Sequence, residues 1–349
     1  MTPSSTRTAT VIVAVRNAGE HVTALAERLR DVTGLADVGA VVIDDGSDDA
    51  TGSALEELIG GSPRIRLVRH SESAGVAARR NEAISLADGE FVWFVDHDDE
   101  WSSAGLSALL AHADGADVVC ARADFRWGPG AADRRRIDGV AAVTSARSIE
   151  ADAAGALLIG GELHGFLWSK LFRRTVLGDT PFPRYVSQSD VVGVARAFSN
   201  ARVVRLIPET VYVYRREPGS ITRVRTPDIG ALESAHDDVL RLVGGRVSRA
   251  ARDTFTARFF CLAAVKTAVR WGVDGRQMRV TTAAAVRRAR GLALVGVARN
   301  SVPLAAAMLL LRIAPPLLPA AIRSALFCLD TLRSLRSRSI RTEQGAVGA

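Results

Sequence analysis

The sequence predicts an α/β protein whose mostly parallel sheet is covered by helices on both faces, followed by a helical C-terminal region. Short apolar runs alternate with helical patterns through the N-terminal half, acidic clusters follow two of these runs directly, and the C-terminal third is helical in pattern and strongly basic. Strands that alternate with helices are typical of parallel sheets, because each crossover helix returns the chain to begin the next strand in the same direction.

The predicted strands are runs of four to eight residues, most of them rich in Val and Ile. Between the first two runs, Val22, Leu25, Leu29 and Val32 recur at the spacing of one helix face. Runs without polar alternation suit strands that are buried on both faces, as in a parallel sheet. The predicted strands span residues 10–15, 40–43, 65–70, 91–95 and 118–125.

Length and charge divide the chain into two regions. The 349 residues, 48% of them apolar, suffice for about two domains. Residues 241–349 hold 19 Arg and Lys against 4 Asp and Glu, a net charge of +15, whereas residues 1–240 hold 26 against 34, a net charge of −8. We therefore predict an α/β domain over residues 1–225 and a basic helical domain over residues 226–349.

The basic region predicts an anionic partner. A membrane surface fits better than nucleic acid, which we do not expect as a partner, because the same region is rich in Leu, Ala and Val. Its uncharged stretches, 302–311 and 313–322, are separated by Arg312, and each is shorter than the about 20 residues of a spanning helix. The prediction is peripheral binding to an anionic membrane, and the alternative is a packed helical subdomain with solvated arginines.

The cysteines and the N-terminus indicate a cytoplasmic protein. The three cysteines, at positions 120, 261 and 328, are scattered and show no metal-ligand spacing, which favours a reducing compartment. No apolar signal region precedes the first predicted strand. Together with the basic region, this predicts a location at the inner face of the cell membrane.

One acidic cluster, Asp96-His97-Asp98-Asp99, directly follows the predicted strand 91–95. Two carboxylates with one residue between them can share a hard divalent cation, Mg²⁺ or Mn²⁺, which keeps other positions open for phosphate oxygens. The alternative is a solvated acidic turn. The position of this acidic cluster at the carboxyl end of a strand favours the metal site, because ligands bind there in parallel sheets.

A second cluster, Asp44-Asp45-Gly46-Ser47, also follows a predicted strand. Its carboxylates can accept hydrogen bonds from a base N–H or a ribose hydroxyl, and Gly46 permits a sharp turn. The alternative is an ordinary turn, since Asp, Gly and Ser are common turn residues.

Two arginines, Arg79 and Arg80, follow Ser73-Ala74-Gly75 at the start of a predicted helix. A helix N-terminus suits a phosphate, and arginine binds phosphate with two hydrogen bonds. The alternative is a surface helix with solvated arginines. The chain has no G-x-G-x-x-G after the first strand and no phosphate-binding G-x-x-x-x-G-K loop, which disfavours dinucleotide-dependent oxidoreduction and P-loop hydrolysis.

Four segments together resemble the motifs of the inverting glycosyltransferase family 2, which has the GT-A fold. The resemblance covers about residues 8–222. It implies transfer of a sugar from a nucleotide-diphosphate donor, with UDP favoured by family habit, to an acceptor hydroxyl on a glycan or a lipid-linked acceptor. The segments are VIVAVRNAGEHV, VIDDGSDDAT, SAGVAARRNEAI and FVWFVDHDDEW.

The resemblance assigns roles within these segments. Asp96 and Asp98 would bind Mg²⁺ or Mn²⁺, with Asp99 supporting them, while Asp96 also faces the donor. Arg79 stands where the family has Ala. The residues implied in donor binding are Val15, Asp44, Asp45, Ser47, Gly75, Arg80 and Asp96.

Three later segments extend the resemblance to bacterial members that build capsular and cell-wall polysaccharides. GFLWSKLFRR suggests supporting roles for Trp168 and Lys170, and VYVYRREPGSIT, at 211–222, suggests one for Arg215. SQSDVVGVARAF places Asp190 as the general base, although Ser189 replaces the usual Glu. The alternative role of Asp190 is a cap on the helix that follows. Alternative functions are a nucleotidyltransferase or a non-catalytic binding subunit.

Overall fold

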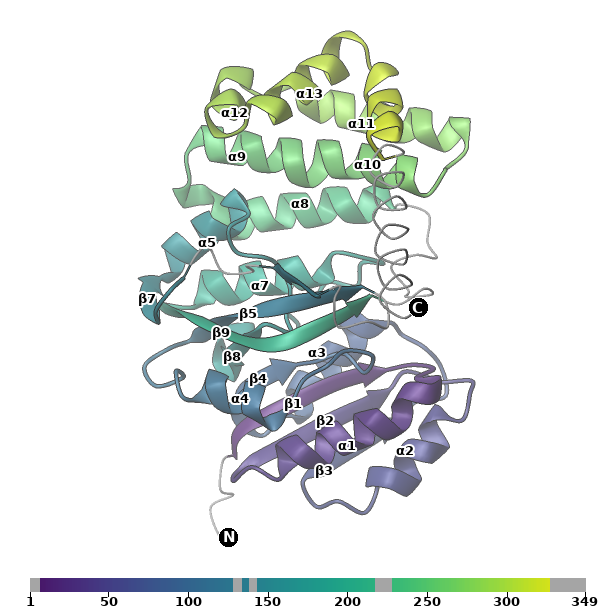
Figure 1. The fold of residues 1–349 in the computed structure, drawn as a ribbon, viewed down its shortest axis with the longest axis vertical. Helices are drawn as coiled ribbons and strands as arrows, with labels where there is room; N and C mark the ends of the chain where they lie inside the picture. The colour runs from purple at the N-terminus through teal and green to yellow at the C-terminus, as the bar shows by residue number, and fades with distance from the viewer. Residues whose placement is uncertain (1–6, 128–133, 138–142, 217–227, 327–349) are drawn as a thin grey trace, which may run out of the picture. The chain divides into compact units, whose positions relative to one another are not determined.

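The computed structural model describes residues 7–127, 134–137, 143–216 and 228–326 (Figure 1). The chain forms two compact units. We name them the sheet unit, Met1–Ser220 with Asp237–Val247, and the helical unit, Ile221–His236 with Ser248–Ala349. Helix α8 (Ile229–Val243) contributes to both. Cys328 and residues 217–222 of the last motif lie outside the described residues.

The sheet unit is built on a mixed, mostly parallel sheet, as the sequence predicts. Among the described residues the strand order is β3-β2-β1-β4-β8-β5-β9-β7, and β6 pairs with β5. All five predicted strands are confirmed. The strands are β1 Arg7–Val15, β2 Val38–Asp44, β3 Ile65–Arg69, β4 Gly89–Phe94, β5 Val118–Trp127, β6 Arg134–Ile137, β7 Arg147–Glu150, β8 Lys170–Arg173 and β9 Val203–Arg216.

The order of the strands brings together the carboxyl ends of β1, β2 and β4, which the sequence motifs follow. Strands β3, β2, β1 and β4 run parallel, so the turns after β1, β2 and β4 lie at one edge of the sheet. Strand β8 is antiparallel to both β4 and β5, which the sequence analysis did not predict. Strand β2 is buried along its whole length, which explains its unbroken apolar sequence.

Helices cover both faces of this sheet. Helix α1 packs on β2 and α2, while α3 packs on β1 and β2 from the other face (Figure 1). In α1, Leu25, Leu29 and Val32 are fully buried, as their spacing predicts. The helices of the sheet unit are η1 Gly19–His21, α1 Val22–Thr33, α2 Thr51–Ile59, α3 Val76–Leu86, α4 Ser103–Leu110, α5 Ala151–Gly160, α6 Arg174–Leu177, α7 Ser189–Asn200 and η4 Gly244–Arg246.

The helical unit has its own apolar core, to which Phe260, Val265, Ala285 and Met308 contribute. Its helices are α9 Arg249–Phe255, a π-helix Thr256–Leu262, α10 Ala263–Arg270, α11 Gly275–Arg290, α12 Leu294–Asn300 and α13 Val302–Ile313, and residues 317–326 are also helical.

The uncharged stretch 302–311 is part of α13, and its Leu304, Met308 and Leu311 are buried in the core of the helical unit. Arg312 donates to the carbonyl oxygens of Ala289 and Leu292 at the end of α11. This stretch therefore packs as the helical alternative describes. Within the described part of the chain, every helix is too short or too polar to cross a lipid bilayer.

Candidate functional site

The turn after β4 carries the first acidic cluster, and its backbone is held from two sides. The amide N–H of Asp96 donates to the Tyr212 hydroxyl at 3.0 Å, and Trp101 Nε1 donates to the carbonyl oxygen of Asp96 at 2.9 Å. Trp101 and Tyr212 both pack edge-on against Trp93 of β4. The aromatic core of the sheet unit thereby fixes the position of the Asp96 carboxylate, which is 30% exposed.

Arg80 joins the acidic turn to α7. Its Nη2 donates to Asp96 Oδ1 at 2.8 Å, and its Nη1 donates to Asp190 Oδ1 at 2.7 Å. The guanidinium is buried, with 7% of the side chain exposed. Burial lowers the pKa of Arg80, but the charges of Asp190 and Asp96 outweigh it and leave the pKa raised. Three residues that the sequence implicates separately therefore form one ion-paired group.

Asp190 lies in the first turn of α7 with its carboxylate directed to Arg80. Its Oδ1 accepts from Arg80 and, at 3.3 Å, from the Ser189 hydroxyl. The residue that caps α7 is Gln188, without a side-chain hydrogen bond, so among the described residues Asp190 receives no backbone N–H as a helix cap would. Burial raises the pKa of Asp190, and Arg80 offsets part of that rise. A carboxylate with a raised pKa suits proton abstraction.

The other two acidic residues of the turn differ in their partners. Asp99 is fully buried and accepts from the Tyr212 hydroxyl at 2.7 Å and the Arg215 N–H at 2.8 Å. Burial, with the charges of Asp96 and Asp98, raises the pKa of Asp99 well above its ordinary value. Burial also raises the pKa of Asp98; His97 opposes this rise and Asp96 adds to it. Asp99 therefore ties the turn to β9, while Asp98 is a carboxylate that a cation would stabilise.

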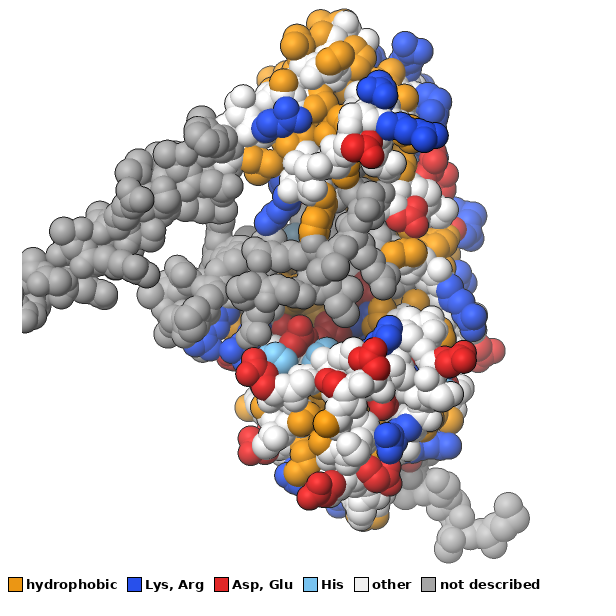
Figure 2. All heavy atoms as spheres, turned by 90° about the vertical axis from the view of Figure 1, so that its right-hand side faces the viewer, with side chains coloured by type: hydrophobic (Ala, Val, Ile, Leu, Met, Phe, Trp, Pro, Cys, Tyr) orange, Lys and Arg blue, Asp and Glu red, His pale blue; other side chains and the backbone are white. Residues whose placement is uncertain are grey.

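A divalent cation fits this pair of carboxylates. Among the described residues no group of three His, Cys, Asp or Glu side chains forms a complete metal cage. A complete cage is not required, because Mg²⁺ and Mn²⁺ commonly take one or two carboxylates and fill the remaining positions with water and substrate phosphates. Asp96 and Asp98 would supply the oxygen donors, and the repulsion between their charges favours a cation there. In Figure 2, histidine and acidic side chains lie side by side on the face toward the viewer.

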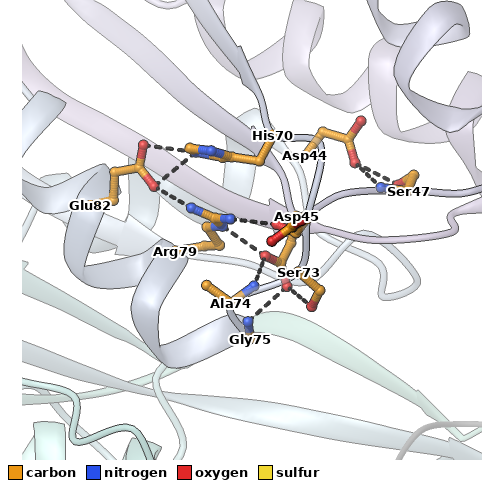
Figure 3. Close-up of polar contacts among 10 residues, drawn as sticks. Asp44, Asp45, Ser47, His70, Ser73, Ala74, Gly75, Arg79 and Glu82 are labelled. Carbon is orange, nitrogen blue, oxygen red and sulfur yellow. Dashed lines mark hydrogen bonds and ion pairs between the residues drawn. The ribbon is translucent and has the colours of Figure 1, made fainter.

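The second acidic cluster organises the start of α3 (Figure 3). Asp45 accepts four hydrogen bonds, two at each carboxylate oxygen. Its Oδ1 accepts from Ala74 N and from Arg79 Nε, each at 2.7 Å. Its Oδ2 accepts from Ser73 Oγ at 2.7 Å and from Gly75 N at 3.0 Å. Burial raises the pKa of Asp45, but these hydrogen bonds outweigh it, so the pKa is lowered. All four lone-pair sites are occupied within the chain. Donor binding by Asp45 stays a prediction, and it would require exchange of one of these contacts.

Arg79 is the second member of this cluster, and the sequence analysis gave it no role beyond phosphate binding. Besides Asp45, it donates to the Glu72 carbonyl oxygen at 2.8 Å and to Glu82 at 3.0 Å, and Glu82 in turn contacts His70 (Figure 3). The presence of Arg79 where the family has Ala was the signal for this role. Because Arg80 is the next residue on α3, the network also sets the position of Arg80.

Asp44 and Ser47 join the ends of β1 and β2. Asp44 is buried and accepts from Ser47 N at 3.0 Å and Ser47 Oγ at 2.5 Å, while Ser47 Oγ accepts from Asn17 N at 3.0 Å. Gly46 has φ +65°, and a Cβ there would lie 2.7 Å from the backbone of Glu72, so both conformation and space require glycine.

Val15 and Gly75 are placed by their backbones. The Val15 side chain is buried in the core, and its carbonyl oxygen accepts from Asp45 N at 2.8 Å. Gly75 has φ +87°, with no heavy atom within 4 Å of a Cβ placed there, so its backbone conformation alone favours glycine. Donor binding by Val15 and Gly75 stays a prediction, and for Val15 it is limited to the backbone.

The residues predicted to support the site lie around β8 and β9. Trp168 stacks on Tyr212 with ring centroids 4.9 Å apart. Lys170 is fully buried, and its Nζ donates at 2.7 Å to the carbonyl oxygens of His164 and Phe166. Burial lowers the pKa of Lys170 to about 8. Arg215 contributes its N–H to Asp99, as described above.

Tyr212 is a site residue that the sequence analysis missed. Its hydroxyl contacts both the Asp96 N–H and the Asp99 carboxylate, so it positions the whole acidic turn. Burial raises the pKa of Tyr212 well above its ordinary value. The available signal was the alternation of tyrosine and valine in 211–214, which places Tyr212 and Tyr214 on one face of a strand.

Comparison with known proteins identifies the family that part of the chain matches. Residues 10–176 match the sequence model of glycosyl transferase family 2. One relative is EpsH of Bacillus subtilis (strain 168), which is named as a glycosyltransferase on a provisional basis. It is 28% identical to this chain over 221 residues, and the aligned region covers 61% of this chain and 62% of EpsH. ExoU of Rhizobium meliloti (strain 1021), a succinoglycan biosynthesis protein, is 31% identical over 177 residues, 50% of this chain and 47% of ExoU. This chain spans less than two thirds of either relative.

A solved structure shares the fold. The crystal structure of S. aureus TarS 1-349 in complex with UDP-GlcNAc superposes with a TM-score of 0.69 and 18% sequence identity, covering 91% of both chains. At this identity the likeness establishes the fold alone. Residues 10–176 are therefore a glycosyl transferase family 2 domain, in a chain that has the GT-A fold.

Proposed function

We propose that this chain transfers a sugar from a nucleotide-diphosphate donor, a UDP-sugar, to an acceptor hydroxyl with inversion at the anomeric carbon. One observation carries the proposal: Arg80 contacts both Asp96 of the acidic turn, at 2.8 Å, and Asp190, at 2.7 Å. The group that would hold the donor and the group that would activate the acceptor therefore lie on two sides of one cation.

Asp190 is the proposed general base. As the acceptor oxygen attacks the anomeric carbon, its proton passes to Asp190, and the bond from the anomeric carbon to the diphosphate oxygen breaks. Arg80 engages only Oδ1 of Asp190 within the described residues, which leaves Oδ2 for the acceptor proton. A single displacement of this kind inverts the anomeric centre and needs no covalent intermediate.

Arg80 is the proposed stabiliser of the leaving group. Its guanidinium is fixed before the reaction by two carboxylates, so it adds positive charge near the leaving diphosphate without further reorganisation. Asp96 and Asp98 would hold Mg²⁺ or Mn²⁺, which supplies Lewis-acid neutralisation of the diphosphate charge when bound.

The names of the relatives support a place in polysaccharide synthesis. ExoU is named for succinoglycan biosynthesis, and TarS was crystallised with UDP-GlcNAc. We place this chain in cell-wall or surface polysaccharide synthesis, acting on a glycan or a lipid-linked acceptor from the inner face of the membrane as a peripheral protein. The non-catalytic alternative would be supported by loss of an acidic-turn carboxylate, and all of them are present.

The test is a screen of nucleotide sugars with the purified full chain. Release of nucleoside diphosphate is measured with Mn²⁺, with Mg²⁺ and with a chelator, and proton NMR of the first product gives the anomeric configuration. We expect one UDP-sugar to react in a metal-dependent way and to yield the inverted anomer. A product that retains the anomeric configuration of the donor would contradict the proposed mechanism. Donor binding without turnover on any glycan or lipid-linked acceptor would favour the binding-subunit alternative.

A further inference from the structure

The helical unit contains a cavity of about 610 Å³ between α11 and residues 315–323. Its lining divides into two chemical classes. Three prolines, two alanines, a valine and a methionine form an apolar surface, and four basic side chains complete the lining with one threonine. The basic residues are Arg279, Arg287, Arg290 and Arg323, and the threonine is Thr282. Among the described residues, no acidic side chain lines the cavity.

These four arginines are exposed, and none forms an ion pair or hydrogen bond with another residue that the structure describes. Other arginines of the same unit are satisfied: Arg288 pairs with Glu233 at 3.0 Å, and Arg312 donates to the end of α11. Further exposed basic residues of the unit, such as Lys266 and Arg276, lie outside the cavity, so the lining is distinguished by four exposed arginines that adjoin an apolar surface. Figure 2 shows basic and hydrophobic side chains side by side on the C-terminal helices.

Thr282 is the uncharged polar residue among the described residues of the lining. Its side chain lines the cavity and is 8% exposed, yet its Oγ1 has no hydrogen-bond partner within the described chain. A buried hydroxyl without a partner is unfavourable, and such groups in folded proteins are usually satisfied by another atom. The Oγ1 atom is itself fully buried, so Thr282 contributes to the wall of the cavity and not a polar contact to a bound molecule.

We propose that this cavity binds a membrane lipid with a phosphate headgroup, the phosphate on the arginines and the start of its hydrocarbon chain on the apolar lining. The volume lies within the range of small-molecule sites, roughly 300–1,000 Å³. Arginine binds phosphate with paired hydrogen bonds. Nucleic acid fits less well, because bases stack on aromatic side chains and the described residues of the lining include none. The proposal gives the expected peripheral membrane binding a specific site, and it does not depend on the transfer reaction.

The first experiment measures binding of the full chain to short-chain phosphatidylglycerol below its critical micelle concentration by calorimetry. Phosphatidylcholine of the same chain length, inorganic phosphate and a short single-stranded RNA are the comparison probes. We expect phosphatidylglycerol to bind at least tenfold more tightly than each of them. Equal binding of inorganic phosphate would contradict the need for a hydrocarbon chain, and tighter binding of RNA would assign the arginines to a different partner.

Two double variants distinguish binding in the cavity from binding to the basic surface in general. The double variant Arg287→Ala with Arg290→Ala is compared with Arg276→Ala with Arg299→Ala, which removes two equally exposed arginines outside the lining. We expect an affinity loss of about tenfold or more in the first and less than twofold in the second. Equal losses of affinity in the two double variants would show that surface charge alone binds the lipid, and they would overturn the proposal.

Ala283→Trp fills the cavity without changing charge, and unfolding midpoints verify that each variant is folded. We expect this variant also to lose phosphatidylglycerol binding, and wild-type affinity in a folded Ala283→Trp variant would overturn the cavity as the site. Lipid binding and sugar transfer are measured separately, so the failure of one proposal is distinguishable from the failure of the other.

Discussion

One pair of arginines in each unit shows a different use of the same side chain. In the sheet unit, Arg79 and Arg80 are buried and each contacts two carboxylates. In the helical unit, Arg287 and Arg290 are exposed and contact no carboxylate of the described chain. A buried arginine with several charged partners fixes geometry, and removing it leaves carboxylates without their counter-charge. An exposed arginine contributes little to folding and remains available to a ligand.

The largest expected effect is that of Arg80→Ala. The change leaves Asp96 and Asp190 without their shared cation, and both carboxylates are about a third exposed, which moderates the penalty. We expect the free energy of unfolding in urea to fall by about 3 kcal/mol. Transfer should fall by at least about 10³-fold, since the leaving group loses its cation. A fully stable variant would show that the ion pairs do not organise the site.

Asp98→Ala should affect catalysis and not folding. Burial and the charge of Asp96 raise the pKa of Asp98, so its removal relieves repulsion and stability should be unchanged or higher. We expect turnover to fall on the order of 10²–10³-fold, with loss of the metal dependence of donor binding. Turnover within threefold of wild type, measured at saturating donor, would remove Asp98 from the metal site.

The pH dependence of the free energy of unfolding should reveal the lowered pKa of Lys170. Burial lowers its pKa in the folded protein to about 8, below the about 10.4 of a free lysine. Between these values the unfolded chain binds more protons, so the stability of wild type relative to Lys170→Met should rise with pH, by up to about 3 kcal/mol, and level off above pH 10.5. Denaturation of both proteins at pH 7.5, 9 and 10.5 measures the difference. A difference that is independent of pH would contradict a charged, buried Lys170.

Arg79→Ala should have a smaller effect than Arg80→Ala. Asp45 keeps three of its four donors, from Ser73, Ala74 and Gly75. We expect a loss of about 1–3 kcal/mol in unfolding free energy, as for a buried charged hydrogen bond, and weaker donor binding as α3 loosens. Arg79→Lys is the matched control, because it keeps the charge and loses the guanidinium geometry. If Arg79→Lys matches wild type, charge alone accounts for the contact.

The smallest effect is expected for Arg287→Ala. The side chain is exposed and has no partner among the described residues, so the free energy of unfolding should change by less than about 0.5 kcal/mol. This variant completes the comparison with Arg80→Ala under the same denaturation conditions. A loss similar to that of Arg80→Ala would mean that the helical unit also uses its arginines to hold its fold.

The parallel half of the sheet was predictable because each strand is an apolar run with local periodicity. Strand β8 was not: Lys170–Arg173 is four residues long and begins with a lysine that the fold buries. Its antiparallel place between β4 and β5 depends on tertiary pairing, which no local pattern encodes. Stretch 302–311 was ambiguous for a related reason, because an apolar helix face suits both a membrane and a protein core.

Site residues were predictable where a motif follows a strand, and less so where partners are distant in sequence. The acidic turns could be placed at the sheet edge from the sequence alone. The pairing of Arg80 with Asp190, 110 residues apart, and the contacts of Tyr212 with the Asp96–Asp99 turn depend on how the sheet closes. The roles in donor and metal binding stay predictions, because they concern groups that only a bound ligand would engage.

The central claim is that Asp190 is the base at one end of a fixed Asp96–Arg80–Asp190 group. The measurement is transfer and donor binding by Asp190→Asn, which is close to isosteric and cannot accept the proton. We expect donor affinity within threefold of wild type and transfer reduced by about 10²–10⁴-fold. In wild type, kcat/KM should fall toward low pH with an apparent pKa above that of an ordinary aspartate, because burial raises the pKa of Asp190. Normal transfer by Asp190→Asn, with only a lower melting temperature, would contradict the account and leave Asp190 a structural residue.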